Sequence, residues 1–302
     1  MPATPDRRLL AITLRLFAAV TLTVMFAIVK LLDARGVSLL ESLFYRQALA
    51  LPLVLGWIAA GPGFASVRTK RPAAHLIRTV LGMAGMALNF LTFMLLPLAE
   101  ATVLLFTVPI FATVLSATVL KERVGVHRWL AVLLGFLGVL LVVQPGGGSV
   151  LPLNGVLVGL CAAVVVSGVS ITLRQIGRTE GAATTVFWFT IVSAVPLGIA
   201  MLFVGEAHDA RTFGMLLGLG LAGGLAQLAL TASLRLAPVS VVLPMDYSNL
   251  LWSALIGWLV FSTLPSRSLW LGAPLIIASG LYIVYREHRL RREQTPIAGP
   301  AD

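Results

Sequence analysis

Residues 82–120 read GMAGMALNFLTFMLLPLAEATVLLFTVPIFATVLSATVL, and a related sequence begins 138 residues later, at Gly220. At this offset ten positions align without a gap, of which eight are identical and two are chemically similar. The aligned pairs are Gly82 with Gly220, Ala84 with Ala222, Gly85 with Gly223, Asn89 with Gln227, Leu96 with Leu234, Leu98 with Leu236, Ala99 with Ala237, Thr102 with Ser240, Val103 with Val241, and Leu105 with Leu243. Internal repetition of this kind predicts a molecule built from two related halves.

The composition indicates a membrane protein. Of the 302 residues, 58% are apolar and only 11% are charged, whereas soluble proteins carry about 25% charged residues. The net charge of +10 would suit a nucleic-acid partner, but no RNA- or DNA-binding motif accompanies it. Basic loops on the cytoplasmic side of a membrane explain the charge better. The single cysteine, Cys161, cannot form an internal disulfide.

Ten segments are long and apolar enough to cross a bilayer, which takes about 20 helical residues. They are residues 9–32, 38–60, 74–96, 99–120, 127–144, 151–176, 182–204, 212–236, 238–262 and 268–285. Arg7, Arg8 and Arg15 precede the first apolar run, as in a signal peptide, but no small-residue cleavage site follows it. We therefore expect this segment to be retained as the first helix.

The basic residues are distributed unequally between the two sides of this topology. With the N-terminus in the cytoplasm, seventeen of the 22 Lys and Arg residues lie on the inner side. The other five are Lys30, Arg35, Arg46, Arg211 and Arg267. Because basic residues are enriched in cytoplasmic loops, the sequence predicts that both termini are cytoplasmic.

The ten segments divide at residues 144–154 into two sets of five, which gives domains of residues 1–148 and 149–302. Because five is odd, the first helices of the two halves run in opposite directions, so the repeats are inverted. Residues 43–45 also correspond to residues 186–188 in the second half. Inverted repeats are typical of secondary transporters, whose substrate site lies near the midplane where the halves meet.

Glycine positions indicate where helices approach closely, since helices in lipid associate through small residues. We expect Gly85 and Gly223 to lie on surfaces that move against each other during transport. Segments 127–144 and 268–285 carry a second set and are interpreted as packing helices; this set is Gly135, Gly138, Gly272 and Gly280. The Gly146-Gly147-Gly148 run lacks the Lys-Ser/Thr of a phosphate-binding loop and is interpreted as a linker.

Asp246 is the most informative polar residue, because a charge inside the membrane costs on the order of 3 kcal/mol even on insertion scales. Two interpretations stay open: a ligand for a substrate ammonium group or a proton, and a structural contact between helices. Arg46 lies at a similar depth from the outer side, and we expect it to pair with Glu41 or Glu100. Lys30 is expected to extend to the outer interface.

Asn89 and Gln227 occupy the same position in the two repeats. They are either a substrate-orienting amide pair near the pseudo-two-fold axis or contacts between helices. Aromatic candidates for an amphipathic pocket are Tyr45, Trp188, Tyr247 and Trp252. The four histidines lack metal-ligand spacing, and the sequence predicts no metal, cofactor or catalytic group.

Pro109 and Pro244 lie within one turn of equivalent positions in the two repeats. Each proline removes a backbone hydrogen bond and frees a carbonyl. A free carbonyl is tolerated in a membrane only where protein or cavity water satisfies it. Both prolines are therefore expected to kink their helices on the face toward the cavity and to take part in gating.

Four stretches are typical of one transporter family. They are Pro97-Leu98-Ala99-Glu100-Ala101-Thr102, Lys121-Glu122-Arg123-Val124, GFLGVLLVVQPG at residues 135–146, and APVSVVLPMDYSNLLWSALIGWLVF at residues 237–261. With them the chain resembles the drug/metabolite transporter superfamily, EamA type, and is similar to the YddG-type amino-acid exporters. The resemblance implies two inverted five-helix repeats around a cavity bounded by helices 1, 3, 4, 6, 8 and 9. The family's acidic turn after helix 9 is replaced by Phe261-Ser262-Thr263-Leu264-Pro265, so a gating acid there is not implied.

Residues and resemblance together predict a bacterial inner-membrane secondary transporter that exports amino acids with broad specificity. In this hypothesis Asp246 accepts from the ammonium group, Asn89 and Gln227 donate to the carboxylate, and Tyr247 and Trp188 border the side-chain space. Alternative substrates are a larger metabolite such as S-adenosylmethionine or riboflavin, and organic cations. A channel is the rival class that saturable counterflow would exclude. Because Asp246 is the only deep acid, facilitated diffusion is favoured over proton coupling. A monomer in the lipid bilayer is compatible with the sequence.

Overall fold

The computed structural model describes residues 5–122, 124–144 and 151–294, so the predicted glycine linker at residues 146–148 lies outside the described part of the chain. The first repeat contains α1 (Pro5–Asp33), α2 (Leu39–Ala60), the 3-10 turn η1 (Phe64–Val67), α3 (Pro72–Leu95), α4 (Leu98–Leu105), α5 (Val108–Thr118) and α6 (Val126–Val143). The second contains α7 (Leu153–Ile176), α8 (Ala182–Val204), α9 (Ala210–Leu236), α10 (Val239–Val242), the 3-10 helix η2 (Leu243–Ser248), α11 (Asn249–Phe261) and α12 (Arg267–Gln294).

The predicted all-helical membrane fold is confirmed, and most predicted spans begin and end within a few residues of the observed helices. Within the described ranges, nine helical spans are long and apolar enough to cross a membrane, one of them formed jointly by α4 and α5. The predicted segment 238–262 is not a continuous helix, because it is divided into α10, η2 and α11. In the described ranges the ten predicted crossings thus correspond to these nine spans, of which α4–α5 is interrupted, and to a tenth that is divided into α10, η2 and α11.

Both segments that carry the predicted proline kinks are interrupted. α4 ends at Leu105, and α5 restarts at Val108 with Pro109 in its first turn. Pro244 occupies the first turn of η2. A proline in a first turn costs no hydrogen bond, because the N–H groups there have no helical partner. The two repeats therefore each contain one broken helix, at corresponding places in the sequence.

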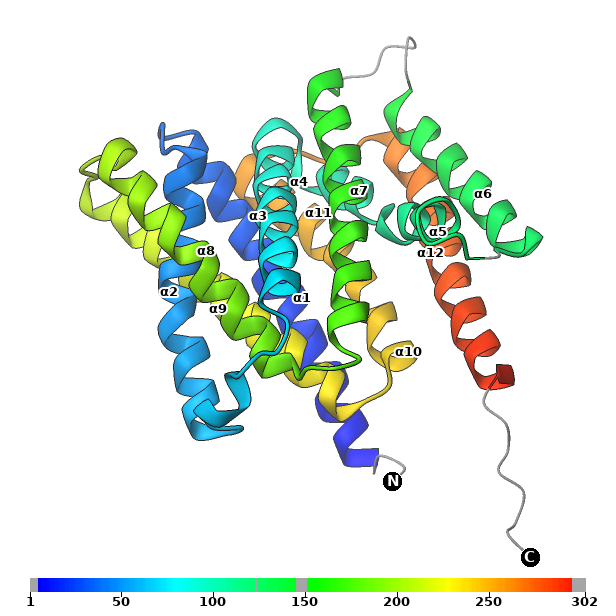
Figure 1. Ribbon diagram of the computed structural model, residues 1–302. Helices are drawn as coiled ribbons and strands as arrows, with labels where there is room; N and C mark the ends of the chain where they lie inside the picture. The colour runs from blue at the N-terminus through cyan, green and yellow to red at the C-terminus, as the bar shows by residue number, and fades with distance from the viewer. Residues whose placement is uncertain (1–4, 123, 145–150, 295–302) are drawn as a thin grey trace, which may run out of the picture.

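The first helices of the two repeats run in opposite directions (Figure 1). α1 leads away from the end of the bundle at which the chain begins, and α7 leads back toward it. α12 also finishes at that end. We call it the terminal end, and the opposite one the far end. The inverted arrangement of the two repeats follows directly from these directions.

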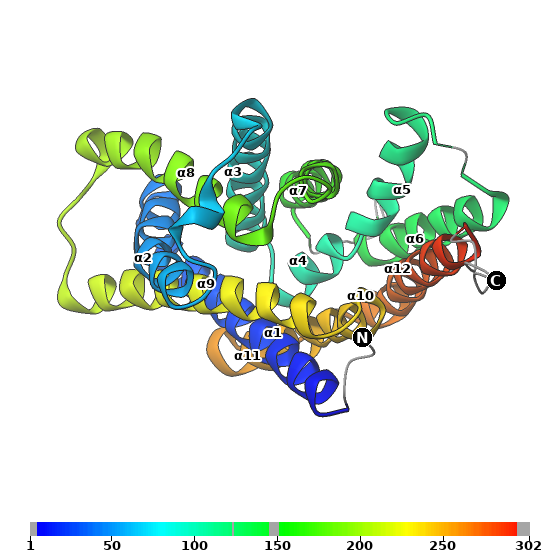
Figure 2. The same ribbon diagram turned by 60° about the horizontal axis from the view of Figure 1, so that its bottom comes forward.

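The repeats interdigitate rather than forming two separate bodies. α1 packs most extensively on α9, α2 on α9 and α8, α3 on α7, and α6 on α12, so each of these contacts joins the first repeat to the second. Seen from the terminal end, α2, α8 and α9 gather at one side and α5, α6 and α12 at the other (Figure 2). α1, α3 and α7 lie between these two groups.

Glycines lie where helices from the two repeats approach closely, as predicted from lipid-phase packing. A Cβ atom at Gly85 would lie 3.2 Å from Val166 Cγ2 on α7, and one at Gly223 would lie 3.1 Å from Arg46 Cγ on α2. A Cβ atom at Gly138 of α6 would be 2.9 Å from the carbonyl oxygen of Gly272 on α12. The interpretation of α6 and α12 as packing helices is confirmed by this approach.

The buried apolar side chains form two main clusters. One joins α4, α6, α7, α11 and α12, and its members include Leu104, Val142 and Ile276. The other joins α1, α2, α3, α8 and α9, and its members include Leu43 and Leu216. Phe26 of α1 and Phe93 of α3 stack at 3.9 Å between ring centroids.

Candidate functional site

A cavity of about 620 Å³ lies toward the terminal end, bounded by α1, α3, the α7–α8 connection, α8 and α9. These elements come from both repeats, so the cavity lies where the repeats meet. Its charged and amide side chains are those of Arg15, Arg78, Glu180, Gln227 and Arg235. The hydroxyl-bearing residues Thr185 and Thr231 also line it. This concave space with a few polar groups is the candidate substrate site.

Asp246 is held by Arg15, a partner that the sequence did not suggest. The guanidinium of Arg15 on α1 donates from Nε to Oδ1 at 2.5 Å and from Nη2 to Oδ2 at 2.6 Å. The Arg15 side chain is 8% exposed and that of Asp246 is 32% exposed. A bidentate pair of this kind is among the strongest hydrogen-bonded arrangements in proteins. The predicted free acceptor for a substrate ammonium is therefore already neutralised, and the structural interpretation of Asp246 fits the geometry.

Asp246 and Tyr247 line a second, mostly apolar cavity of about 210 Å³. Pro109 and Phe106 line it as well, so both broken helices border this space. The rings of Tyr247 and Phe106 meet edge to face at 4.8 Å. Since Arg15 lines the larger cavity and Asp246 the smaller, their ion pair lies between the two spaces.

The structure does not join Asn89 and Gln227 in an amide pair. Gln227 lines the larger cavity, whereas Asn89 Oδ1 is buried with no hydrogen-bond partner in the described part of the chain. The physical reason lies in the packing: α3 lies mainly against α7 and α8, while α9 lies mainly against α1 and α2. Equivalent positions in the two repeats therefore do not meet here.

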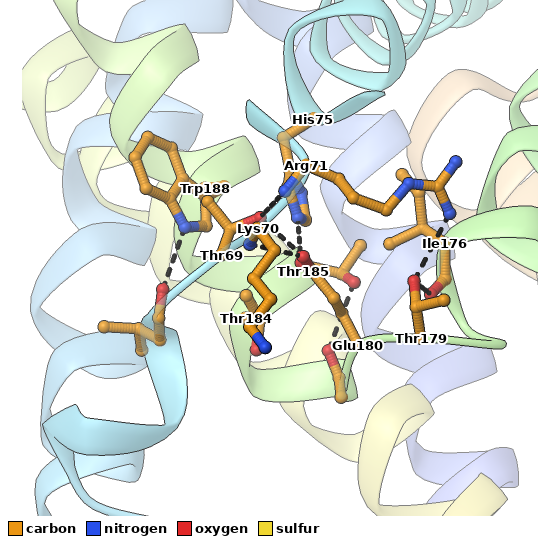
Figure 3. Close-up of polar contacts among 12 residues, drawn as sticks. Thr69, Lys70, Arg71, His75, Ile176, Thr179, Glu180, Thr184, Thr185 and Trp188 are labelled. Atoms are coloured by element: carbon orange, nitrogen blue, oxygen red, sulfur yellow. Dashed lines mark hydrogen bonds and ion pairs between the residues drawn. The ribbon is translucent and has the colours of Figure 1, made fainter. Parts of the chain in front are cut away.

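Trp188 does not border the space around Tyr247, contrary to the prediction. Its Nε1 donates to the carbonyl oxygen of Val67 at 2.9 Å, and its ring lies over that of His75. Figure 3 shows Trp188 and His75 side by side among the residues around Glu180. The tryptophan lies near the start of α8 and fastens this helix to the segment that connects α2 with α3.

Glu180 is the centre of that cluster and joins the α7–α8 connection to the first repeat (Figure 3). It accepts hydrogen bonds from Thr69 Oγ1 at 2.6 Å and Lys70 N at 3.0 Å, and it pairs with His75 Nε2. Burial by itself raises the pKa of the Glu180 carboxyl, but these donors outweigh it and hold the pKa below its ordinary value. Glu180 is thus an ionised carboxylate whose oxygens are already engaged.

Arg46 does not form the predicted ion pair with Glu41 or Glu100. Its guanidinium donates to Gln47 Oε1, which belongs to the next residue of α2. Glu41 instead accepts from Glu206 N at 3.0 Å, and Glu100 accepts from Ser266 N at 3.0 Å. Both carboxylates lie in the first turns of their helices, where they are directed toward loops of the second repeat rather than inward.

Lys30 turns inward instead of extending to the interface. Its Nζ donates to the carbonyl oxygens of Phe93, Met94 and Leu96 at 3.0–3.2 Å. These carbonyls lie at the C-terminal end of α3, where helical acceptors lack partners and positive charge is favoured. Lys30 therefore has a structural role at the junction of α1 and α3.

Among the described residues, no three His, Cys, Asp or Glu side chains lie together in a way that could hold a metal ion.

Comparison with known proteins decides the family. The model of the EamA-like transporter family matches residues 9–144 and again residues 153–285. The chain belongs to the EamA-like transporter family. Each of the two matched segments contains five of the predicted spans. As an EamA-like transporter, the chain is a multi-pass membrane protein that moves small metabolites.

Curated relatives of this EamA-like transporter carry different substrates. It is 29% identical to the riboflavin transporter of Vibrio cholerae serotype O1, over 84% of this chain and 85% of that protein. It is 30% identical to the pseudopaline exporter CntI of Pseudomonas aeruginosa, over 90% of this chain and 93% of that protein. It is 26% identical to the S-adenosylmethionine uptake transporter of Rickettsia prowazekii, over 82% and 81% of the two chains.

The far end of this EamA-like transporter is held together by carboxylates of the first repeat. Glu41 holds the α8–α9 connection through Glu206 N and pairs with His208 at 3.1 Å. Glu100 holds the α11–α12 connection through Ser266 N. The Glu41 and Glu100 side chains are buried. These contacts join the two repeats at the end opposite the 620 Å³ cavity.

Sequence reasoning missed Arg15, Arg78 and Glu180 as members of the site in this EamA-like transporter. Arg15 and Arg78 were counted only among the basic residues of the inner side, and Glu180 was given no role. The signal that could have found two of them is position: Arg15 is ten residues into α1, and Arg78 is six residues into α3. At 1.5 Å per residue, Arg15 lies roughly 15 Å from the start of its helix.

Proposed function

We propose that this transporter carries a metabolite of the size of riboflavin or S-adenosylmethionine, by alternating access around the 620 Å³ cavity. The observation that carries the proposal is the cavity itself, which lies between the repeats and is lined by arginine, amide and hydroxyl groups. Drug-sized ligands occupy pockets of about 300–1,000 Å³. A free amino acid would leave much of this space unfilled.

The charges around the cavity also favour riboflavin, which has no ammonium group, over a free amino acid. The amino-acid hypothesis needs an acceptor for an ammonium group, and Asp246 was the candidate. Its two oxygens accept from Arg15, while Glu180 is engaged by Thr69, Lys70 and His75. Displacing either carboxylate from its partner would leave a buried charge unpaired. Gln227 stays a candidate substrate ligand, because it lines the cavity.

The names of the relatives support the same choice, since one is a riboflavin transporter and another an S-adenosylmethionine uptake transporter. The proposed mechanism is facilitated diffusion, in which the substrate gradient sets the direction of net flow. The pairing of Asp246 with Arg15 supports facilitated diffusion. A proton-coupled carrier needs an acid that is free to titrate within the transport cycle.

The proposed orientation places both termini in the cytoplasm of a bacterial cell, as the distribution of basic residues favours. The 620 Å³ cavity then faces the cytoplasm, and the Glu41 and Glu100 contacts close the outer side. In the proposed transport cycle these far-end contacts open while the terminal end closes. The group α1, α2, α8 and α9 moves relative to the group α4–α7, α11 and α12.

A counterflow panel on purified protein in proteoliposomes tests this function. Vesicles loaded with unlabelled riboflavin, S-adenosylmethionine, tryptophan or alanine would receive the corresponding labelled compound outside. We expect saturable counterflow with riboflavin or S-adenosylmethionine, and at least tenfold less with the amino acids. Counterflow with the amino acids alone would restore the amino-acid hypothesis. Single-channel conductance without saturable exchange would exclude a carrier.

A further inference from the structure

Arg78 is a cationic side chain of the cavity wall, and two of its three guanidinium nitrogens lack a hydrogen-bond partner among the described residues. It lines the 620 Å³ cavity from α3. Its guanidinium carbon lies 4.0 Å from the centre of the Phe189 ring. Nε and Nη1 are buried and have no hydrogen-bond partner in the described ranges. A guanidinium packed on an aromatic face is fixed in orientation. Nε and Nη1 are covered by protein atoms here, so an anion that enters beside the guanidinium would supply the acceptors that they lack.

The other charges around Arg78 do not compensate it. Within the described part of the chain, Arg78 forms no ion pair with any Asp or Glu. The carboxylate that lines the cavity, Glu180, is engaged by Thr69, Lys70 and His75. Asp246 is engaged by Arg15. The two acids near the cavity therefore each have a partner already. The positive charge of Arg78 is left without a counter-ion among the described residues.

A second buried arginine strengthens the positive field. Arg46 of α2 is 9% exposed and lies near enough to Arg78 for the two like charges to act on each other. It donates to Gln47 and has no carboxylate partner among the described residues. Two uncompensated guanidinium groups in a low-dielectric interior are costly unless an anion balances them.

Glycines of the repeated stretch make room for this arrangement. A Cβ atom at Gly82, one turn after Arg78, would lie 2.9 Å from the Phe189 ring and would also meet the Arg78 guanidinium. A Cβ atom at Gly223 would lie 3.1 Å from Arg46 Cγ. These glycines therefore accommodate the two arginine side chains as well as the close approach of helices.

We infer that Arg78 binds an oxyanion, a carboxylate or phosphate group of the transported metabolite, with Arg46 adding to the positive field behind it. This inference rests on the proposed function, because it assumes that the substrate enters the 620 Å³ cavity. Thr185, Gln227 and Thr231 line the same space and supply neutral donors for the remaining oxygens. Arginine suits this role because its planar fork of donors matches two oxygens of one group.

The test compares ligands that differ only in the anionic part. Riboflavin 5′-phosphate and riboflavin form one pair, and S-adenosylmethionine and its methyl ester, which lacks only the carboxylate charge, form the other. Equilibrium binding to purified protein would be measured for wild type, Arg78→Gln and Arg78→Lys. Arg68→Gln is the matched control, because Arg68 is an exposed arginine on the α2–α3 connection.

We expect wild type to prefer at least one member with a phosphate or carboxylate over the partner that lacks this group, by tenfold or more. Arg78→Gln should remove this preference and leave affinity for the partner without the group within about twofold. Arg78→Lys should retain part of it, while Arg68→Gln should retain most. Equal affinity of wild type for both members of each pair would overturn the inference, and so would an unchanged preference in Arg78→Gln.

Two further measurements keep the inference testable if Arg78→Gln does not fold. Inorganic phosphate should compete with the anionic ligand on wild type, in vesicles of zwitterionic lipid. If phosphate fails to compete there but phosphatidylglycerol does, a lipid headgroup occupies the site and the assignment to substrate is wrong. Saturable counterflow with neutral compounds alone would leave the transporter function standing and remove only the oxyanion site, whereas its absence with every compound would contradict the proposed function itself.

Discussion

Asp246→Asn should destabilise the protein by on the order of 3 kcal/mol and abolish most transport. The substitution leaves the Arg15 guanidinium, 8% exposed, without the carboxylate that receives two of its hydrogen bonds. Breaking a buried ion pair by removing one partner costs about 3–5 kcal/mol, and the lower end applies because Asp246 is partly exposed to a cavity. The measurement is thermal unfolding in detergent micelles, together with counterflow in proteoliposomes.

The controls separate the ion pair from a general charge effect. The double variant Arg15→Gln/Asp246→Asn should recover much of the lost stability, because no unpaired charge remains. Glu122→Gln, at the exposed Arg174–Glu122 pair, should change the unfolding temperature very little, because exposed pairs contribute about 0–1 kcal/mol. If Asp246→Asn were as stable as wild type, the Arg15–Asp246 pair would not be what holds α1 to η2.

Lys30→Met should lower stability by on the order of 2–3 kcal/mol, the second largest effect we expect. The carbonyl oxygen of Phe93 would normally accept from the N–H of residue 97, but that residue is Pro97 and has no N–H. Lys30 Nζ supplies the missing donor at 3.2 Å and also serves Met94 and Leu96. Each buried acceptor left without a partner costs about 1–3 kcal/mol. Thermal unfolding measures the loss.

Lys70→Met is the matched control for this prediction, because Lys70 is exposed and only its backbone N–H makes a recorded hydrogen bond. It should unfold within a degree or two of wild type. Lys30→Arg keeps the charge and several donors and should retain most of the stability. An unfolding temperature for Lys30→Met equal to that of wild type would mean that water or other groups satisfy the end of α3 equally well.

Hydropathy and the internal repeat were sufficient to predict the architecture. Apolar runs define helices of membrane length directly, and an odd repeat of five forces the inverted directions seen for α1 and α7. Pro109 and Pro244 predicted kinks in two segments that were expected to be continuous, whereas both segments are interrupted and each proline lies in the first turn of a new helix. The close approach of α6 and α12 followed from glycine spacing.

The partners of the polar residues could not be predicted in the same way. Arg15 and Asp246 are 231 residues apart in the sequence, and Glu180 and His75 are 105 residues apart. No local pattern specifies such pairs, because they depend on which helices become neighbours. The expected pairing of Arg46 with Glu41 or Glu100 failed for this reason. The assumption that equivalent repeat positions meet also failed for Asn89 and Gln227, since α3 and α9 pack on different helices.

The central claim is that the 620 Å³ cavity opens to one side of the membrane at a time, and labelling of a single cysteine tests it most directly. Thr231 lines the cavity, and Cys161 is the single native cysteine, so the variant is Thr231→Cys in a Cys161→Ser background that retains counterflow. A membrane-impermeant maleimide would be added to vesicles of each orientation. The account predicts labelling from the side of the termini in the absence of substrate, and protection by saturating substrate. Equal labelling from both sides at once, unchanged by substrate, would contradict it.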